Sequence, residues 1–292
     1  MSTSLYAVVV APPVPAPRGA TLLRSANPVV EPDPRWMQGL TWRAQPCGSR
    51  DVVEGIDMCV AFSGFTTDFT EGAAPQYVPP HVAVALPCSG ISGQTVLEET
   101  RDRAAALLDR CQTLGIADEL WTGDRAIARG WPNDYLSESA GLDQPKGTTA
   151  QGVIRSFAEA EQYLADSFCA GGGMIHATPR TATYWARFGL VDRQADGRLL
   201  SKLGTVVVAD PGYDGSAPDG TVDASGDTAW VYMSGSVDVR LGPVELSTGA
   251  GLDLSGIDRL DNDFTVYAHR AFAATFESCA RGGINVSHTT LT

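Results

Sequence analysis

The chain has 292 residues, of which 43% are hydrophobic and 19% charged, and its formal net charge is −13. This composition is that of a folded protein with a substantial core, not of a disordered tail or a fibrous repeat. No apolar run approaches the roughly 18 residues that span a bilayer, which excludes a membrane channel or transporter. The acidic balance argues against a protein that grips nucleic-acid phosphates over a broad surface.

The first 75 residues separate their charges. Residues 1–50 carry five arginines against two acidic residues, and residues 51–75 carry five acidic residues and no base. A basic, proline-rich arm followed by an acidic loop is typical of chain that lies on a neighbouring subunit, although an ordinary irregular terminus is the alternative. The candidate contacts between subunits are Arg18, Arg24, Arg35, Arg43, Arg50, Asp51, Glu54, Asp57, Asp68 and Glu71.

Residues 5–10 are apolar. They lack a preceding basic region and are followed at once by prolines, so we expect no secretory signal. The six cysteines have no paired spacing, which favours free thiols in a reducing cytoplasm. They are Cys47, Cys59, Cys88, Cys111, Cys169 and Cys279.

The strongest helical pattern covers residues 95–121, after a short strand predicted over residues 78–86. Acidic residues gather near its start, and it ends at Gly123, a typical C-terminal glycine. At about 1.5 Å per residue this helix would be about 40 Å long. Its apolar positions include Leu97, Ala104, Leu107, Leu108, Cys111 and Leu114.

Two further helices follow a turn-rich connection over residues 129–147. The first starts at Thr148 or Thr149, and the second is opened by Thr178 and Pro179 after a short buried strand. The apolar face of the first is Val153, Phe157, Ala160, Leu164 and Phe168. Later residues predict strands, so the fold class is α+β. These strands cover residues 205–209, 229–233, 236–241, 264–270 and 274–286.

The sequence offers no convincing active site. The histidines have no metal-binding spacing, and there is no nucleophile elbow or phosphate-binding loop. His176 could serve as a catalytic base, but a structural histidine is the favoured interpretation. Residues 201–263 hold ten aspartates, but their spacing does not match a calcium loop. We therefore expect ordinary turns, and no metal or cofactor, at Asp210, Asp214, Asp219, Asp258, Asp261 and Asp263.

The order of these elements resembles the major capsid proteins of tailed bacteriophages, which share the Johnson fold. An extended arm and a long loop precede one long helix that closes on ADELWTGD, residues 117–124. The segments GTTAQGVIRSFAEAEQYLADS, MIHATPRTATYWARFGL and LLSKLGTVVVAD then follow in the family's order. The closing rows WVYMSGSVDVRLG and FTVYAHRAFAATFESCARGGINV resemble its late strands. The likeness covers most of residues 40–288.

The resemblance implies a division of the chain. Residues 1–50 would be the N-terminal arm, and residues 51–94 the extended loop and the start of the peripheral domain. Residues 95–122 would be the spine helix of the peripheral domain, and residues 123–263 the axial domain. Residues 264–292 would be the strands that return to the peripheral domain, together with the C-terminus.

It also implies a function without catalysis. The chain would be a major capsid protein that self-assembles into hexamers and pentamers of an icosahedral head shell around phage dsDNA. Its partners would be its own copies with portal, scaffold or cement proteins, in the virion and, during assembly, in the host cytoplasm, without a membrane. Some relatives lock their shells with a Lys–Asn isopeptide bond from the extended loop. Here the only lysines are Lys146 and Lys202, so we expect non-covalent contacts or a cement protein.

Three alternatives stay open. An encapsulin-like nanocompartment would use the same fold to enclose a cargo enzyme. A soluble hydrolase or carbohydrate-binding protein would use the Asp-rich loop and His176. The third is another virion structural protein, such as a tail tube or a minor head component. The long helix argues against a tail tube, because tail-tube subunits are mainly β.

Overall fold

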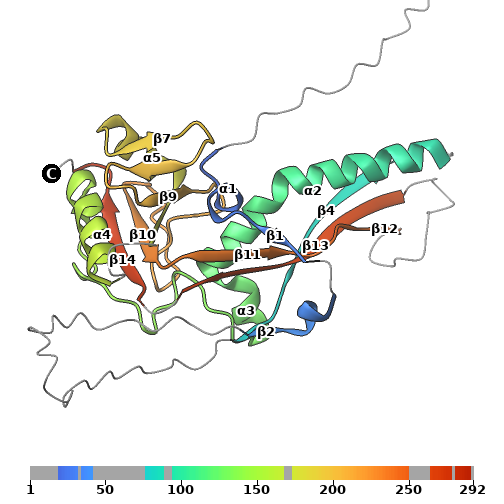
Figure 1. The fold of residues 1–292 in the computed structure, drawn as a ribbon, viewed down its shortest axis with the longest axis horizontal. Helices are drawn as coiled ribbons and strands as arrows, with labels where there is room; N and C mark the ends of the chain where they lie inside the picture. The colour runs from blue at the N-terminus through green and yellow to red at the C-terminus, as the bar shows by residue number, and fades with distance from the viewer. Residues whose placement is uncertain are drawn as a thin grey trace, which may run out of the picture.

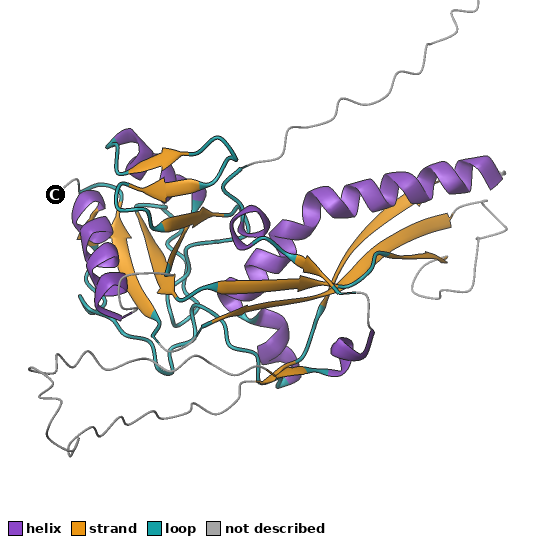
Figure 2. Ribbon diagram, viewed as in Figure 1, coloured by secondary structure: helices purple, strands orange, loops and turns teal. Residues whose placement is uncertain are grey.

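The computed structural model describes residues 19–31, 34–41, 76–88, 94–167, 173–249, 264–277 and 280–290. These residues form two lobes, each built around its own sheet (Figure 1). Helices and strands are interspersed in both, so the predicted α+β class is confirmed (Figure 2).

The elongated lobe is built on a five-stranded sheet around β13 (Phe264–Phe276). The strands β4 (His81–Cys88) and β12 (Glu245–Gly249) pair antiparallel with its first half. β11 (Val237–Leu241) pairs antiparallel with its second half, and β1 (Val29–Val30) pairs parallel with β11. β13 therefore runs the length of this lobe.

The long helix α2 (Gln94–Thr122) has 29 residues and lies along this sheet. Its Ala104 and Leu108 pack against Val266 and Ala268 of β13. At a rise of about 1.5 Å per residue it is about 44 Å long, as the apolar periodicity predicted.

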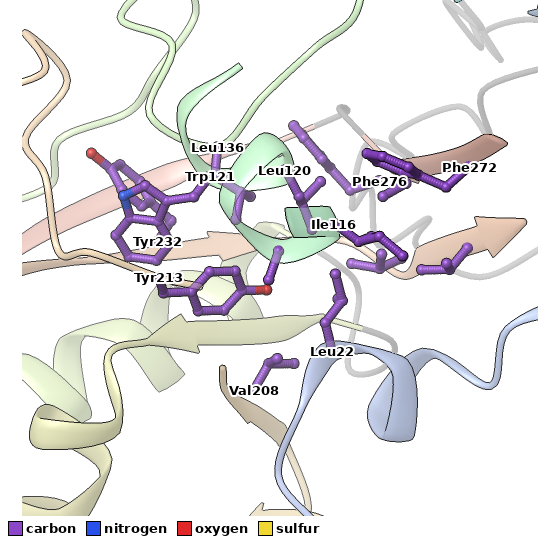
Figure 3. Close-up of a cluster of buried hydrophobic side chains, with 14 of the residues drawn as sticks. Leu22, Ile116, Leu120, Trp121, Leu136, Val208, Tyr213, Tyr232, Phe272 and Phe276 are labelled. Carbon is purple, nitrogen blue, oxygen red and sulfur yellow. The ribbon is translucent and has the colours of Figure 1, made fainter. Parts of the chain in front are cut away.

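The C-terminal end of α2 enters the main core between the lobes. Trp121 lies against Tyr213 and Tyr232, with ring centroids 4.8 Å apart in both pairs. Figure 3 shows these rings beside Leu120 and Leu136 at the end of the helix. Aromatic side chains of this size dominate core energetics, so this cluster fixes the helix between the two sheets.

The second lobe is built on a seven-stranded sheet. Its strands lie in the order β5 (Gln151–Gly152), β14 (Gly282–Ser287), β10 (Thr228–Ser234), β6 (Met174–Ala177), β9 (Val206–Ala209), β8 (Leu199–Ser201) and β7 (Val191–Arg193). β5 and β7 are its edges.

Two amphipathic helices pack on this sheet, α4 (Val153–Ser167) and α5 (Pro179–Arg187). α5 begins as predicted, because the Thr178 hydroxyl accepts a hydrogen bond from Thr181 N at 3.2 Å. Trp185 of α5 is buried in the core beneath α4.

The first described residues join the lobes. α1 (Leu22–Ala26) lies against β9 and β11, and β1 follows it. The 3₁₀ helix η1 (Pro34–Gln38) then leads to β2 (Leu40–Thr41), which pairs with β3 (Gln76–Tyr77). This segment therefore contacts both sheets.

Several elements differ from the sequence prediction. Residues 264–276 form one strand instead of two, and α4 starts after a two-residue strand instead of a threonine cap. A short helix, α3 (Asp124–Arg129), follows Gly123 directly. The short strands β7, β8 and β12 lack the alternating apolar pattern that would have indicated them.

Sheet pairing joins strands from segments on both sides of residue 263, where the resemblance implied a domain boundary. β11 and β12 fall within residues 123–263 but pair with β13 of the five-stranded sheet. β14 falls within residues 264–292 but pairs with β10 and β5 of the seven-stranded sheet. The physical reason is that a strand's own residues indicate its existence, whereas its partner strand is fixed by tertiary packing.

Candidate functional site

His176 is a structural residue of the core. It is fully buried, with Nδ1 2.9 Å from the Tyr213 hydroxyl and Nε2 2.9 Å from the Ser234 hydroxyl. Burial lowers the pKa of His176 to about 3, so the ring is neutral at physiological pH. The favoured interpretation from the sequence agrees with this placement, which leaves the ring no solvent contact.

The buried histidine makes stability depend on pH. Its pKa is depressed in the folded chain, so the unfolded chain takes up the proton first as the pH falls below about 6.5. Between there and about pH 3, this group should lower the free energy of unfolding by roughly 1 kcal/mol per pH unit. Urea unfolding of the unassembled chain at pH 7 and pH 4.5 should show a smaller pH-dependent loss for His176→Gln than for the wild type. Equal losses would contradict the buried neutral ring.

The aspartates after β9 serve separate turns. Asp214 Oδ1 accepts a hydrogen bond from Ser216 N at 2.8 Å, and Asp219 Oδ1 accepts one from Thr221 N at 2.9 Å. Among the described residues, no set of three or more His, Cys, Asp or Glu side chains is placed to hold a metal ion. The other three candidate aspartates, Asp258, Asp261 and Asp263, lie outside the described residues.

Asp210 joins three parts of the fold. Its carboxylate is fully buried and accepts hydrogen bonds from Leu22 N at 2.8 Å, the Thr113 hydroxyl at 2.7 Å and Gly212 N at 3.0 Å. These donors belong to α1, α2 and the loop after β9. A buried carboxylate that accepts several hydrogen bonds holds the segments of its donors together.

Arg281 holds the linker between the two sheets to a loop at the end of α2. It lies in the linker between β13 and β14, and its side chain is 7% exposed. Its guanidinium donates to the carbonyl oxygens of Tyr135, Glu138 and Ala140, at 2.5, 2.8 and 2.5 Å. That loop packs on the end of α2, since Leu136 N donates to Leu120 O at 2.9 Å.

The residues of the row ELWTGD, 119–124, form the corner between α2 and α3. Glu119 is buried and accepts hydrogen bonds from Arg125 N at 2.9 Å and Ala126 N at 3.0 Å, which caps α3. Burial raises the pKa of Glu119. Trp121 Nε1 donates to the Ser216 hydroxyl at 2.9 Å, and Gly123 turns the chain at φ +65°.

The outer surface presents apolar side chains and open sheet edges. β1 is an edge strand of the five-stranded sheet and carries two exposed valines. Unpaired strand edges and exposed apolar groups are the features by which chains associate. The exposed large hydrophobic residues are Val29, Val30, Leu114, Ile127, Ile154, Leu203, Val222 and Leu246.

Of the ten predicted contact residues, Arg24 and Arg35 fall in the described part of the chain, and both are exposed. Arg24, on α1, donates from Nε to Asp196 O at 2.9 Å, and Arg35 lies in η1. The others lie outside the described residues: Arg18, Arg43, Arg50, Asp51, Glu54, Asp57, Asp68 and Glu71.

Sequence reasoning missed the capping role of Glu119 and the buried contacts of Arg281. Gly123 is predicted as the C-terminal glycine of the long helix, but no prediction covers α3 or the capping of its first residues by Glu119. Arg281 has no local signal, because its Glu138 partner lies 143 residues away in the sequence.

No protein-family model matches the sequence, and no curated protein matches it. No helix in the described ranges is long and apolar enough to cross a bilayer.

Two solved structures share the architecture over nearly the whole chain. One is the holo-SrpI encapsulin complex from Synechococcus elongatus PCC 7942, at 10% identity and a TM-score of 0.52, over 98% of this chain and 95% of that chain. The other is from Mycobacterium phage Adephagia, at 16% identity and a TM-score of 0.50, over 93% of this chain and 91% of that chain. The likeness to phage capsid proteins inferred from the order of elements is thereby confirmed as a capsid-like fold.

Proposed function

We propose that this chain is a structural shell subunit, the major capsid protein of a tailed phage, which self-assembles without catalysing a reaction. The observation that carries the proposal is the shared fold, which extends over 91% or more of both chains in each comparison. Fold alone does not determine function, so the surface must support the same conclusion.

The surface supports association between copies. Val29 and Val30 are 48% and 60% exposed on an edge strand, and Ile127 of α3 is 60% exposed. Such groups are covered when copies pack side by side. Lys146 pairs with Glu159 at 2.8 Å and Lys202 pairs with Asp192, so contacts between copies are proposed to be non-covalent.

In the proposed shell, the five-stranded lobe with α2 is the peripheral domain and the seven-stranded lobe is the axial domain. Hexamers and pentamers would form around the axial domains, and the ten basic and acidic contact candidates would pair between copies. A net charge of −13 would keep packaged dsDNA from adhering broadly to the inner wall. Portal, scaffold or cement proteins would bind this shell in the virion, after assembly in the host cytoplasm.

An encapsulin-like nanocompartment is the second candidate, and the match to an encapsulin complex favours it. The contents of purified particles separate the two. Nuclease-protected DNA supports the phage head, and a co-purifying protein cargo without DNA supports the nanocompartment.

Sedimentation velocity of the purified chain tests the shell proposal. We expect a species far larger than the 30.8 kDa monomer.

Reversing the charge of an arm residue, as in Arg35→Glu, should reduce the assembled fraction. The matched control is Arg129→Glu on the exposed end of α3, which should leave that fraction unchanged. A chain that remains monomeric or dimeric, both alone and when co-expressed with the proteins encoded beside it, would contradict the proposal.

A further inference from the structure

An apolar groove of about 300 Å³ lies on the seven-stranded lobe between α4 and the turn that joins β8 to β9. Phe157 and Ala158 of α4 line one side, and Leu190 and Leu203 line the other. Leu203 is 82% exposed, the highest value among the large hydrophobic side chains of the described residues. Apolar surface this open is unfavourable in water until something covers it.

The groove also holds an unsatisfied acceptor. Glu161 lines it, and its Oε2 accepts a hydrogen bond from the Thr205 hydroxyl at 2.7 Å. Its Oε1 is buried and finds no hydrogen-bond partner among the described residues. An acceptor left unpaired at the wall of the groove favours an occupant that brings a donor as well as apolar side chains, once the Glu161 side chain turns its Oε1 toward the groove. An extended peptide brings both.

The chain supplies such a peptide close by. Residues 5–10, LYAVVV, are apolar, rich in β-branched side chains and free of proline, so every backbone N–H is a donor. The described chain begins at Gly19, which packs against Gly197 so closely that a Cβ on Gly19 would lie 2.4 Å from Gly197 O. Gly197 is in the turn of the β7–β8 hairpin, and Leu190 and Leu203 are near the other end of that hairpin.

The distances allow the chain to reach its own groove. Six residues separate Gly197 in the turn from Leu203 beyond β8, a distance of at most about 20 Å. The eight residues between residue 10 and Gly19 span up to about 30 Å when extended. A tether this short gives the segment a millimolar effective concentration at the groove, above that of any other copy in dilute solution.

We propose that residues 5–10 dock in the groove between α4 and the β8–β9 turn of their own chain, covering Leu203 and donating a backbone N–H to Glu161 Oε1. The contact does not require assembly, so it can fail or hold independently of the shell proposal.

Hydrogen exchange of the unassembled full chain tests this docking. We expect the amides of residues 5–10 to exchange about tenfold more slowly than in an unstructured peptide, and Leu203→Asp to abolish that protection. Leu246→Asp, on an exposed leucine of β12 in the other lobe, should leave it intact. Unprotected amides in the wild type would overturn the proposal. The proposal would also be overturned if Leu203→Asp changed the amide exchange of residues 168–172, which follow α4 in the sequence, and left the exchange of residues 5–10 unchanged.

Cross-linking decides whether the segment and the groove belong to one chain. The double variant Val9→Cys with Leu203→Cys should form a disulfide between these two positions under mild oxidation, and the product should migrate as a monomer. Val9→Cys with Leu246→Cys is the control and should form no such bond. Covalent dimers linked through positions 9 and 203 would assign the groove to a second copy and overturn the same-chain proposal.

Discussion

Replacing Arg281 with methionine is expected to lower the free energy of unfolding by about 3–5 kcal/mol. The guanidinium satisfies three carbonyl oxygens and lies 3.2 Å from Glu138 Oε2, in a site where its side chain is 7% exposed. Methionine fills similar volume but supplies no donor, so the carbonyl groups lose their partners in a buried site. The loop over residues 135–140 would then detach from the linker that joins the sheets.

Arg155→Met is the matched control for that experiment. Arg155 is on α4, its side chain is 59% exposed, and its ion pair with Glu159 is long, at 3.7 Å. Exposed pairs of this kind contribute at most about 1 kcal/mol, so the control should unfold almost as the wild type does. Denaturant titration monitored by tryptophan fluorescence gives both values. Equal stability of the two variants would show that Arg281 does not stabilise the contact between the β13–β14 linker and the loop over residues 135–140.

Gly123→Ala is expected to destabilise the chain by about 3 kcal/mol or more. Two effects combine at this corner. The backbone has φ +65°, which disfavours a side chain by about 1–2 kcal/mol. A Cβ would also lie 2.2 Å from Tyr135 Cδ1, so the ring would have to move.

Gly130 separates the two effects. It has the same φ of +65°, but a Cβ there would meet nothing within 4 Å. Gly130→Ala should therefore show only the backbone effect, and the difference between the two variants measures the packing against Tyr135. If both alanine variants lose the same stability in thermal or denaturant unfolding, the close contact at Gly123 is wrong. Gly123→Ala should also cost less stability when it is added to Tyr135→Ala than when it is made in the wild type, because the clashing ring is then absent.

The helices could be predicted because their signals are local. α2 follows from apolar side chains at three- and four-residue steps, and α5 follows from Thr178 and Pro179 at its start. The sequence predicts separate strands over residues 264–270 and 274–286, whereas β13 runs without a break from Phe264 to Phe276. In the structure Arg270 is buried, and it donates to Gly242 O at 2.9 Å and Gln112 Oε1 at 3.1 Å.

The candidate site could be predicted only in part, because its contacts join residues that are far apart in the sequence. The arm arginines are visible as a change in composition, but most of them lie outside the described residues. The sequence predicts an ordinary turn at Asp210, and its carboxylate does accept a hydrogen bond from Gly212 N, but the bonds that it accepts from Leu22 and Thr113 come from distant segments. Tertiary contacts such as these leave no periodic pattern in the sequence.

Cryo-electron microscopy of the particles formed by this chain tests the central claim most directly. The account predicts a closed icosahedral shell with the seven-stranded lobes gathered around the five-fold and six-fold positions. The five-stranded lobes with α2 should lie toward the periphery of each capsomer. Open filaments, discrete small oligomers, or a shell with the five-stranded lobes at the axes would contradict it.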